Sequence, residues 1–121
     1  MKPYLLISAT IILALSTTVR GQNLFEADSG SGAIYEFTPG GVQSTFASGL
    51  YDPAVLAFNG AGDLFQTDFG SGNIYEYTPG GAKNTFASGL SEPLGLAFDS
   101  AGNLFTADHL SRLLQNRVIS P

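Results

Sequence analysis

Three aspartates recur every 40 residues, and their type and spacing are the first features that suggest chemistry. Asp28, Asp68 and Asp108 each end a short run of β-forming residues, and the first two precede a glycine-rich turn. Carboxylates repeated in this way could form a ring that faces an axial site or binds a cation. Alternatively, each carboxylate accepts hydrogen bonds from backbone N–H groups of the following turn. We expect the second role, because recurrence in every repeat is typical of a scaffold residue.

Two glutamates and one histidine are the other candidates for proton chemistry. Glu36 and Glu76 share one repeat position between aromatic residues, and as a pair they could act as general acid and base. Their separation by one repeat favours charges exposed at sheet edges, which discourage edge-to-edge pairing. His109 is the only histidine, which excludes a metal site with several histidine ligands. Its position beyond the intact repeats indicates a surface or tail residue.

Tyrosines form the remaining group of candidates. Such side chains could line a sugar or peptide surface, or they could pack inside the fold. They lie within the repeats at Tyr35, Tyr51, Tyr75 and Tyr77. We predict no catalytic and no metal-ligating residue, and we take as candidate ligand-binding residues Asp28, Asp68, Asp108, Tyr35 and Tyr75.

These candidates lie on a repeat that must also position them. Residues 23–62 and 63–102 are identical at 25 of 40 positions, and a third copy starts at residue 103. A period of this length predicts an architecture in which each unit completes its core only against its neighbour.

Within the repeat, short β-rich runs alternate with turns that contain glycine or proline, which predicts an antiparallel all-β fold. Alternation places Ile74 and Glu76 on one side of a strand and Tyr75 and Tyr77 on the other. Because both sides carry bulky residues, we expect each sheet to lie between two others. Residues 95–98 alternate small and large, as in an innermost strand. The expected strands are residues 94–99, 63–68, 73–78 and 84–88.

The N-terminal segment has a different composition. Residues 1–21 combine Lys2, an apolar run over residues 5–15 and small residues near position 21, which predicts a secretory signal peptide and a mature start near Gln22. Without this segment, three basic residues face ten acidic ones, a formal charge of −7. Nucleic acid is therefore excluded as a partner, and we expect a secreted or periplasmic protein without a membrane contact after cleavage. No cysteine is available for a disulfide.

Two strings carry a resemblance to a known family. PLGLAFDSAGNLFTAD at residues 93–108 and DPAVLAFNGAGDLFQTD at residues 52–68 resemble the NHL-type β-propeller repeat of the gluconolactonase (senescence marker protein) group. The resemblance covers residues 22–108 and implies a partial propeller of about two and a half four-stranded blades, followed by a non-repeat tail at residues 109–121. In the lactonase branch, an Asn or Asp directly after the motif proline helps to hold a divalent metal. Ala54 and Leu94 occupy that position here.

The tail leaves three alternatives open. The sequence after Asp108 has no periodic relation to the repeats, which suggests a truncated or frameshifted gene. Residues 110–118 could instead form an amphipathic helix that caps the last sheet. Three chains could also close a six-bladed ring as a homo-oligomer.

From these features we expect a secreted binding or scaffold module for a protein or carbohydrate ligand, without a cofactor. The alternatives are a remnant of a metal-dependent lactone or ester hydrolase, with calcium as its cofactor, and a non-functional truncated product.

Overall fold

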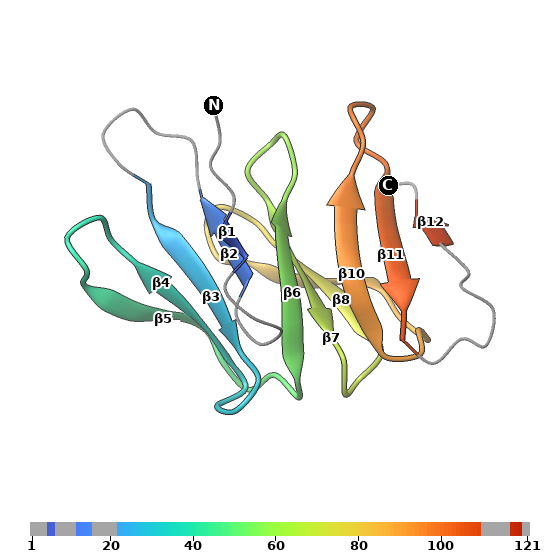
Figure 1. Ribbon diagram of the computed structural model, residues 1–121, viewed down its shortest axis with the longest axis horizontal. Coiled ribbons are helices and arrows are strands. Elements are labelled where there is room, and N and C mark those ends of the chain that lie inside the picture. The colour runs from blue at the N-terminus through green and yellow to red at the C-terminus, as the bar shows by residue number, and fades with distance from the viewer. Residues whose placement is uncertain (1–4, 7–11, 16–21, 110–116, 120–121) are drawn as a thin grey trace.

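The chain folds into three antiparallel sheets in sequence order (Figure 1). A computed structural model describes residues 5–6, 12–15, 22–109 and 117–119. These residues form twelve strands and no helix, so the predicted all-β class is confirmed.

Each sheet contains strands that follow one another along the chain. Sheet 1 contains β1 (Leu5–Leu6), β2 (Ile12–Leu15), β3 (Leu24–Asp28), β4 (Ala33–Phe37) and β5 (Gln43–Ala47). Sheet 2 contains β6 (Pro53–Phe58), β7 (Leu64–Asp68), β8 (Asn73–Tyr77) and β9 (Lys83–Ala87). Sheet 3 contains β10 (Pro93–Phe98), β11 (Leu104–Asp108) and β12 (Arg117–Ile119). The four expected strands match β10, β7, β8 and β9 to within one residue at each end.

The sequence repeat and the sheet are out of phase. Residues 63–102 supply β7, β8 and β9 to sheet 2, but their last strand, β10, is the first strand of sheet 3. The first strands β6 and β10 lie side by side in the middle of the molecule (Figure 1). Each repeat therefore links two sheets, and the alternating run at residues 95–98 lies in the predicted inner position.

Both ends of the described chain add strands that the repeat does not predict. β2 pairs with β3 in the place that β6 and β10 take in their own sheets. β12 pairs with β11, so the alternative of a helix over residues 110–118 is wrong at residues 117–118. Residues 110–116 lie outside the described part. Of the predicted signal peptide, residues 5–6 and 12–15 are described, as β1 and β2. The expected cleavage site directly follows residues 16–21, which lie outside the description.

One phenylalanine per repeat holds neighbouring sheets together. Phe25 of sheet 1 lies edge-on to Phe46 at 5.2 Å and to Phe58 of sheet 2 at 5.3 Å between ring centroids. Phe65 repeats this arrangement between sheets 2 and 3, with Phe86 and Phe98 both at 5.0 Å. Edge-to-face geometry adds to the stabilisation that burial of these rings provides.

The two sides of sheet 2 have distinct roles, as the alternation predicts. Its leading face, which packs against sheet 1, carries Leu64 and Tyr77. Its trailing face, which packs against sheet 3, carries Phe65 and Ile74. All four side chains are buried. The same terms, leading and trailing face, apply to the equivalent positions of sheets 1 and 3.

Gly32 and Gly72, at the ends of the β3–β4 and β7–β8 turns, allow the backbone to approach the linker to the next sheet. Gly72 has φ 70°, and a Cβ there would collide with the carbonyl oxygen of Leu90. The Leu90 N–H donates to the Gly72 carbonyl oxygen at 3.0 Å, and Leu50 and Gly32 form the same bond one repeat earlier. Only glycine meets both requirements at this position.

At the opposite end of the strands, each hairpin pairs one carboxylate with one amide. Asn59 donates its side-chain N–H to Asp63 at 2.9 Å, and one repeat later Asn103 donates to Asp99 at 2.9 Å. The side-chain bond from Asn103 is the main cause that lowers the pKa of Asp99, and backbone bonds from Asn103, Ala101 and Gly102 add to it. These carboxylates therefore stabilise the hairpin turns of the scaffold.

Replacing Phe65 with alanine tests the role of the aromatic contacts. We expect Phe65→Ala to lower the free energy of unfolding by about 3–5 kcal/mol, because the substitution leaves a cavity between two sheets. Val42→Ala, at a side chain that is 66% exposed, is the control and should change it by less than about 0.5 kcal/mol. Urea denaturation followed by circular dichroism measures both. Similar losses for the two variants would contradict this role.

Candidate functional site

The three repeated aspartates lie at one end of the molecule, which we call the loop end. The loop end consists of residues 29–32, 50–52, 69–72, 90–92 and His109, and it is the lower end in Figure 1. β3, β7 and β11 finish there, and β6 and β10 start there, so turns and linkers from all three sheets meet.

Asp68 connects two segments of the loop end. Its carboxylate is 1% exposed and accepts hydrogen bonds from three backbone N–H groups. Ser71, in the following turn, donates at 3.0 Å, whereas Tyr51 and Asp52, in the linker between sheets 1 and 2, donate at 2.9 and 3.2 Å. The expected bond to the following turn is present, and the bonds to the linker are an additional feature. Asp68 thus serves the scaffold.

The other two aspartates make part of this pattern. Asp28 accepts from the Gly30 N–H at 2.9 Å and from the Ser31 hydroxyl at 2.9 Å. Asp108 accepts from the Ser91 N–H at 3.2 Å, which is the repeat equivalent of the Tyr51 bond. Within the described residues, the Oδ1 atom of Asp108 is buried without a partner. A cluster of three or more His, Cys, Asp or Glu suited to a metal ion is also absent from this part of the chain.

The glutamates are not at sheet edges, so that expectation is wrong. β4 and β8 are each flanked by a strand on both sides, and Glu36 and Glu76 are half-buried on the trailing faces, opposite Phe25 and Phe65. The Asn23 side-chain N–H donates to Glu36 at 2.6 Å. The sequence could not show this, because the neighbours of a strand are set by the sheet.

A small cleft opens between sheets 1 and 2. Its volume is about 240 Å³. Glu36 is the only ionisable carboxylate among its lining residues, which are Phe25, Glu36, Phe46, Phe58, Gly62, Leu64, Tyr77, Thr78 and Pro79. The cleft is largely apolar and lies over the aromatic contacts.

The tyrosines divide into packed and exposed residues. Tyr77 is 2% exposed and donates its hydroxyl to Gln66 at 3.4 Å; burial is the main cause that raises its pKa, followed by Tyr75 and Asp68. Tyr75 packs against the same core and lies under the Lys83 ammonium, 3.8 Å from the ring centroid. Tyr35 donates to the Ser31 hydroxyl at 3.1 Å. Ligand binding by Tyr35 and Tyr75 stays a prediction.

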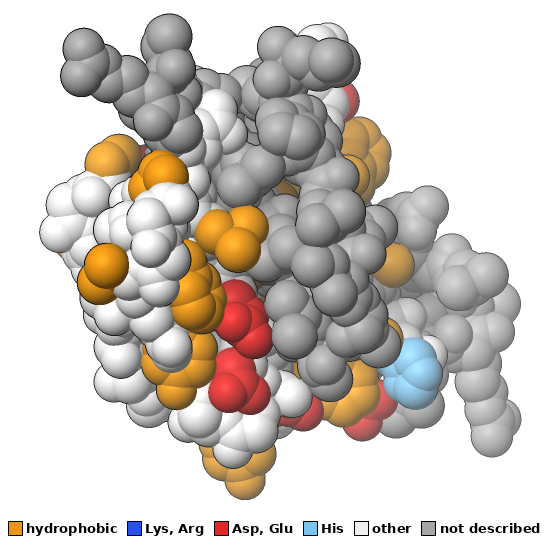
Figure 2. Space-filling model, turned by 60° about the vertical axis from the view of Figure 1, so that its left-hand side comes forward, with side chains coloured by type: hydrophobic (Ala, Val, Ile, Leu, Met, Phe, Trp, Pro, Cys, Tyr) orange, Lys and Arg blue, Asp and Glu red, His pale blue; other side chains and the backbone are white. Residues whose placement is uncertain are grey.

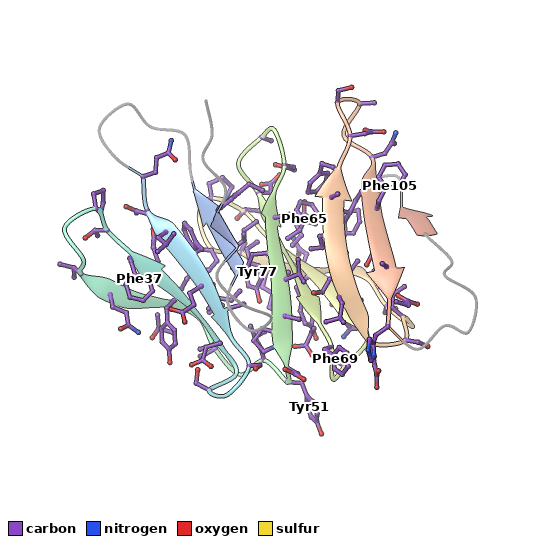
Figure 3. All side chains as sticks on the ribbon, in the orientation of Figure 1. Phe37, Tyr51, Phe65, Phe69, Tyr77 and Phe105 are labelled. Atoms are coloured by element: carbon purple, nitrogen blue, oxygen red, sulfur yellow. The ribbon has the colours of Figure 1, made fainter. Side chains whose placement is uncertain are left out.

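Tyr51 is the tyrosine that projects from the loop end (Figure 3). Its side chain is 81% exposed, yet its backbone N–H is bound to Asp68 and its ring lies against Gly70. The ring is so close that a Cβ at residue 70 would collide with it. The backbone that carries this exposed aromatic ring is thus bound by a buried carboxylate.

A second group lies beside it at the loop end. The rings of Phe69 and His109 are 5.9 Å apart, and His109 Nδ1 lies 3.2 Å from a carboxylate oxygen of Glu92. Glu92 has φ 53°, a conformation that residues other than glycine rarely adopt. We call Tyr51, Phe69, Glu92 and His109 the aromatic cluster. In the sequence, only variation between repeats could have indicated this cluster. Ser29, Phe69 and His109 occupy the same repeat position, directly after the invariant aspartate.

The residues after the motif prolines do not fit a metal. Ala54 is buried and Leu94 is 36% exposed, and both side chains are hydrocarbon. Divalent cations such as calcium require oxygen ligands. The described residues therefore do not form the site that the lactonase resemblance implies at this position. The described residues also include no helix that is long and apolar enough to span a membrane.

Asparagine at position 68 tests the connection made by Asp68. We expect Asp68→Asn to lower the free energy of unfolding by about 1–3 kcal/mol, because a buried amide N–H₂ would face N–H donors. Asp28→Asn, where both partners lie within three residues, is the matched control and should cost about 1 kcal/mol or less. Urea denaturation compares them. Equal losses at both positions would contradict a special role for the linker bonds.

Comparison with known proteins supports the fold. No protein-family model matches the chain, and no curated protein is a significant match. The solved virginiamycin B lyase of Staphylococcus aureus aligns with a TM-score of 0.66 at 13% identity, over 88% of this chain and 37% of the lyase. A protein of the gluconolactonase family aligns with a TM-score of 0.65 at 19% identity, over 80% of this chain and 44% of that protein. A streptogramin B lyase gives 0.66 and 15%, over 88% and 37%.

The chain thus spans less than half the length of each of these structures. All are β-propellers, and at such low identity the likeness shows the fold alone. The resemblance to gluconolactonase-like propeller repeats is confirmed at that level: this chain is a partial β-propeller.

Proposed function

We propose that the chain is an exported propeller module that binds a protein or carbohydrate ligand through the aromatic cluster at its loop end. Export rests on the composition of residues 1–21. Binding in place of catalysis is supported by the repeated aspartates, whose carboxylates accept bonds from turns and linkers.

The observation that carries the binding role is Tyr51. Its ring is 81% exposed, so a ligand that covers it removes a large apolar area from water. Its fixed backbone lowers the entropy lost on binding, which makes it a preorganised contact. Tyrosine is also one of the residues that most often dominate binding energy.

The charges around the cluster narrow the ligand class. Asp52, Glu92 and Asp108 lie at the same end, and the whole chain has a formal charge of −5. Ligands with phosphate or carboxylate groups are disfavoured by this field. A neutral glycan or a peptide with basic residues fits the surface best.

Loss of the Tyr51 ring tests this function. We expect Tyr51→Ala to weaken binding to the best glycan or peptide by about tenfold or more, since truncation of a central aromatic contact commonly costs over 1 kcal/mol. Val42→Ala, an exposed apolar residue on the β4–β5 turn, is the matched control and should bind as the wild type. Glycan and peptide arrays identify the ligand, and calorimetry measures its affinity. Equal affinities for Tyr51→Ala and wild type would contradict the proposal.

The alternative is a remnant of a metal-dependent lactone or ester hydrolase, which the gluconolactonase-family structure favours. A metal that binds only the folded state raises the melting temperature, and the rise grows with the logarithm of the metal concentration once this concentration exceeds the dissociation constant. We expect calcium and zinc at millimolar concentration to leave the melting temperature of the full chain unchanged. A rise with either ion that EDTA reverses would favour the hydrolase.

A further inference from the structure

Sheet 2 is buried on both faces, whereas sheets 1 and 3 each have one face whose residues are more exposed than their equivalents in the other sheets. On the trailing faces, Phe25 is 7% and Phe65 2% exposed, whereas their equivalent Phe105 in sheet 3 is only half-buried. Ala97, directly opposite Phe105 across β10 and β11, is exposed, whereas its equivalent Ala57 is half-buried. The trailing face of sheet 3 therefore lacks a neighbouring sheet in the described structure.

The leading face of sheet 1 shows the complementary pattern. Leu64 and Leu104 are 1% and 0% exposed, but their equivalent Leu24 is half-buried. Phe37, opposite Leu24 in the register, is also half-buried where its equivalent Tyr77 is 2% exposed. Figure 2 brings this side forward and shows hydrophobic side chains gathered around a few acidic ones. Phe37 and Phe105 lie on opposite sides of the molecule (Figure 3).

Within the described residues, these two faces match the two halves of the interface that joins successive sheets. Twice within the chain, a trailing phenylalanine packs against the leading face of the following sheet, at Phe25 with Phe58 and at Phe65 with Phe98. Phe105 carries the same ring in the third repeat, and no aromatic ring lies against it among the described residues. The leading face of sheet 1 offers Leu24 and Phe37 at the positions that Leu64 and Tyr77 use in the first interface.

We propose that a second copy of this chain covers both faces, head to tail, so that the trailing face of sheet 3 packs against the leading face of sheet 1 in the partner. The contact continues the interface that already joins the three sheets. It differs from ligand binding at the loop end and does not depend on it, because Tyr51 lies on neither face.

The number of copies follows from the number of sheets. Propellers contain four to eight blades. With three sheets per chain, two copies give six blades, and three copies would exceed this range. A ring of two copies contains two equivalent contacts and leaves no face uncovered. The sequence-based expectation of three chains assumed two-odd blades per chain, whereas the described strands form three sheets. Sheet 1 still contains β3, β4 and β5 when residues 1–21 are removed.

Glu26 provides a sensitive position within the contact. It occupies the leading face of sheet 1, where sheet 2 has Gln66 at 0% exposure. A carboxylate that the partner covers loses hydration, whereas an amide loses less. Glu26→Gln should therefore strengthen the dimer, a result that a merely destabilising substitution could not produce.

Two single variants and their mixture test the orientation of the contact. Ala97→Glu blocks the trailing face at an exposed side chain, so that folding is preserved. Phe37→Asp blocks the leading face, and Tyr35→Asp on the same face replaces it if Phe37→Asp does not fold. Val42→Asp, on the β4–β5 turn and on neither face, is the control. Analytical ultracentrifugation of the purified full chain gives the mass, and circular dichroism melts confirm folding.

We expect a dimer for the wild type and for Val42→Asp, and a dimer at least about 30-fold weaker for each face variant, as for loss of a central contact. Mixing the two face variants should restore a 1:1 dimer, because one intact trailing face then meets one intact leading face. A monomeric wild type at high concentration would overturn the proposal. A dimer that either face variant leaves unchanged, or a mixture that stays monomeric, would overturn the head-to-tail arrangement.

Discussion

The edge-on contact between one phenylalanine and two others, repeated between successive sheets, is the interaction on which the structure depends. The ring of Phe65 fills the space between sheets 2 and 3, and the leading face of sheet 2 fills the equivalent space on its other side. No sheet has a core of its own. Each sheet buries its apolar residues against a neighbouring sheet, so folding of one repeat is linked to folding of the next.

The turns and linkers of the loop end are positioned by the strands of this core. Asp68 lies at the last position of β7, and its carboxylate holds the turn of sheet 2 and the linker from sheet 1 at the same time. The position of Tyr51 is thus determined by two sheets together. An exposed surface of this kind combines variable side chains with a rigid frame, which is how loops on stable scaffolds carry function.

The parts of the fold that depend on neighbouring residues could be predicted from the sequence. Alternation of residue types along β8 and the glycine at position 72 determine the strand and its turn locally. The environment of Glu76 could not be predicted, because β7 and β9 on its two sides are brought there by the sheet. The sequences of β2 and β12 lie outside the 40-residue repeats, so the repeat pattern does not predict these two strands.

The candidate site was predictable only in part. Recurrence identified Asp68 as a residue of the scaffold, and the structure shows that role in its three backbone bonds. The bonds to the linker join residues 16 and 17 positions apart, and such spacing has no signature in the sequence. Tyr51 has no distinguishing context in the sequence either, since Ser91 takes its place in the next repeat.

The offset between repeat and sheet has a consequence for how such a molecule grows during evolution. Because each unit ends with the first strand of the following sheet, a tandem duplication of 40 residues inserts one complete blade, whatever the breakpoint within the unit. Its new neighbours present faces that already fit, so the duplication requires no compensating substitution. The number of sheets can then change one at a time by unequal recombination, and selection afterwards acts on the loops.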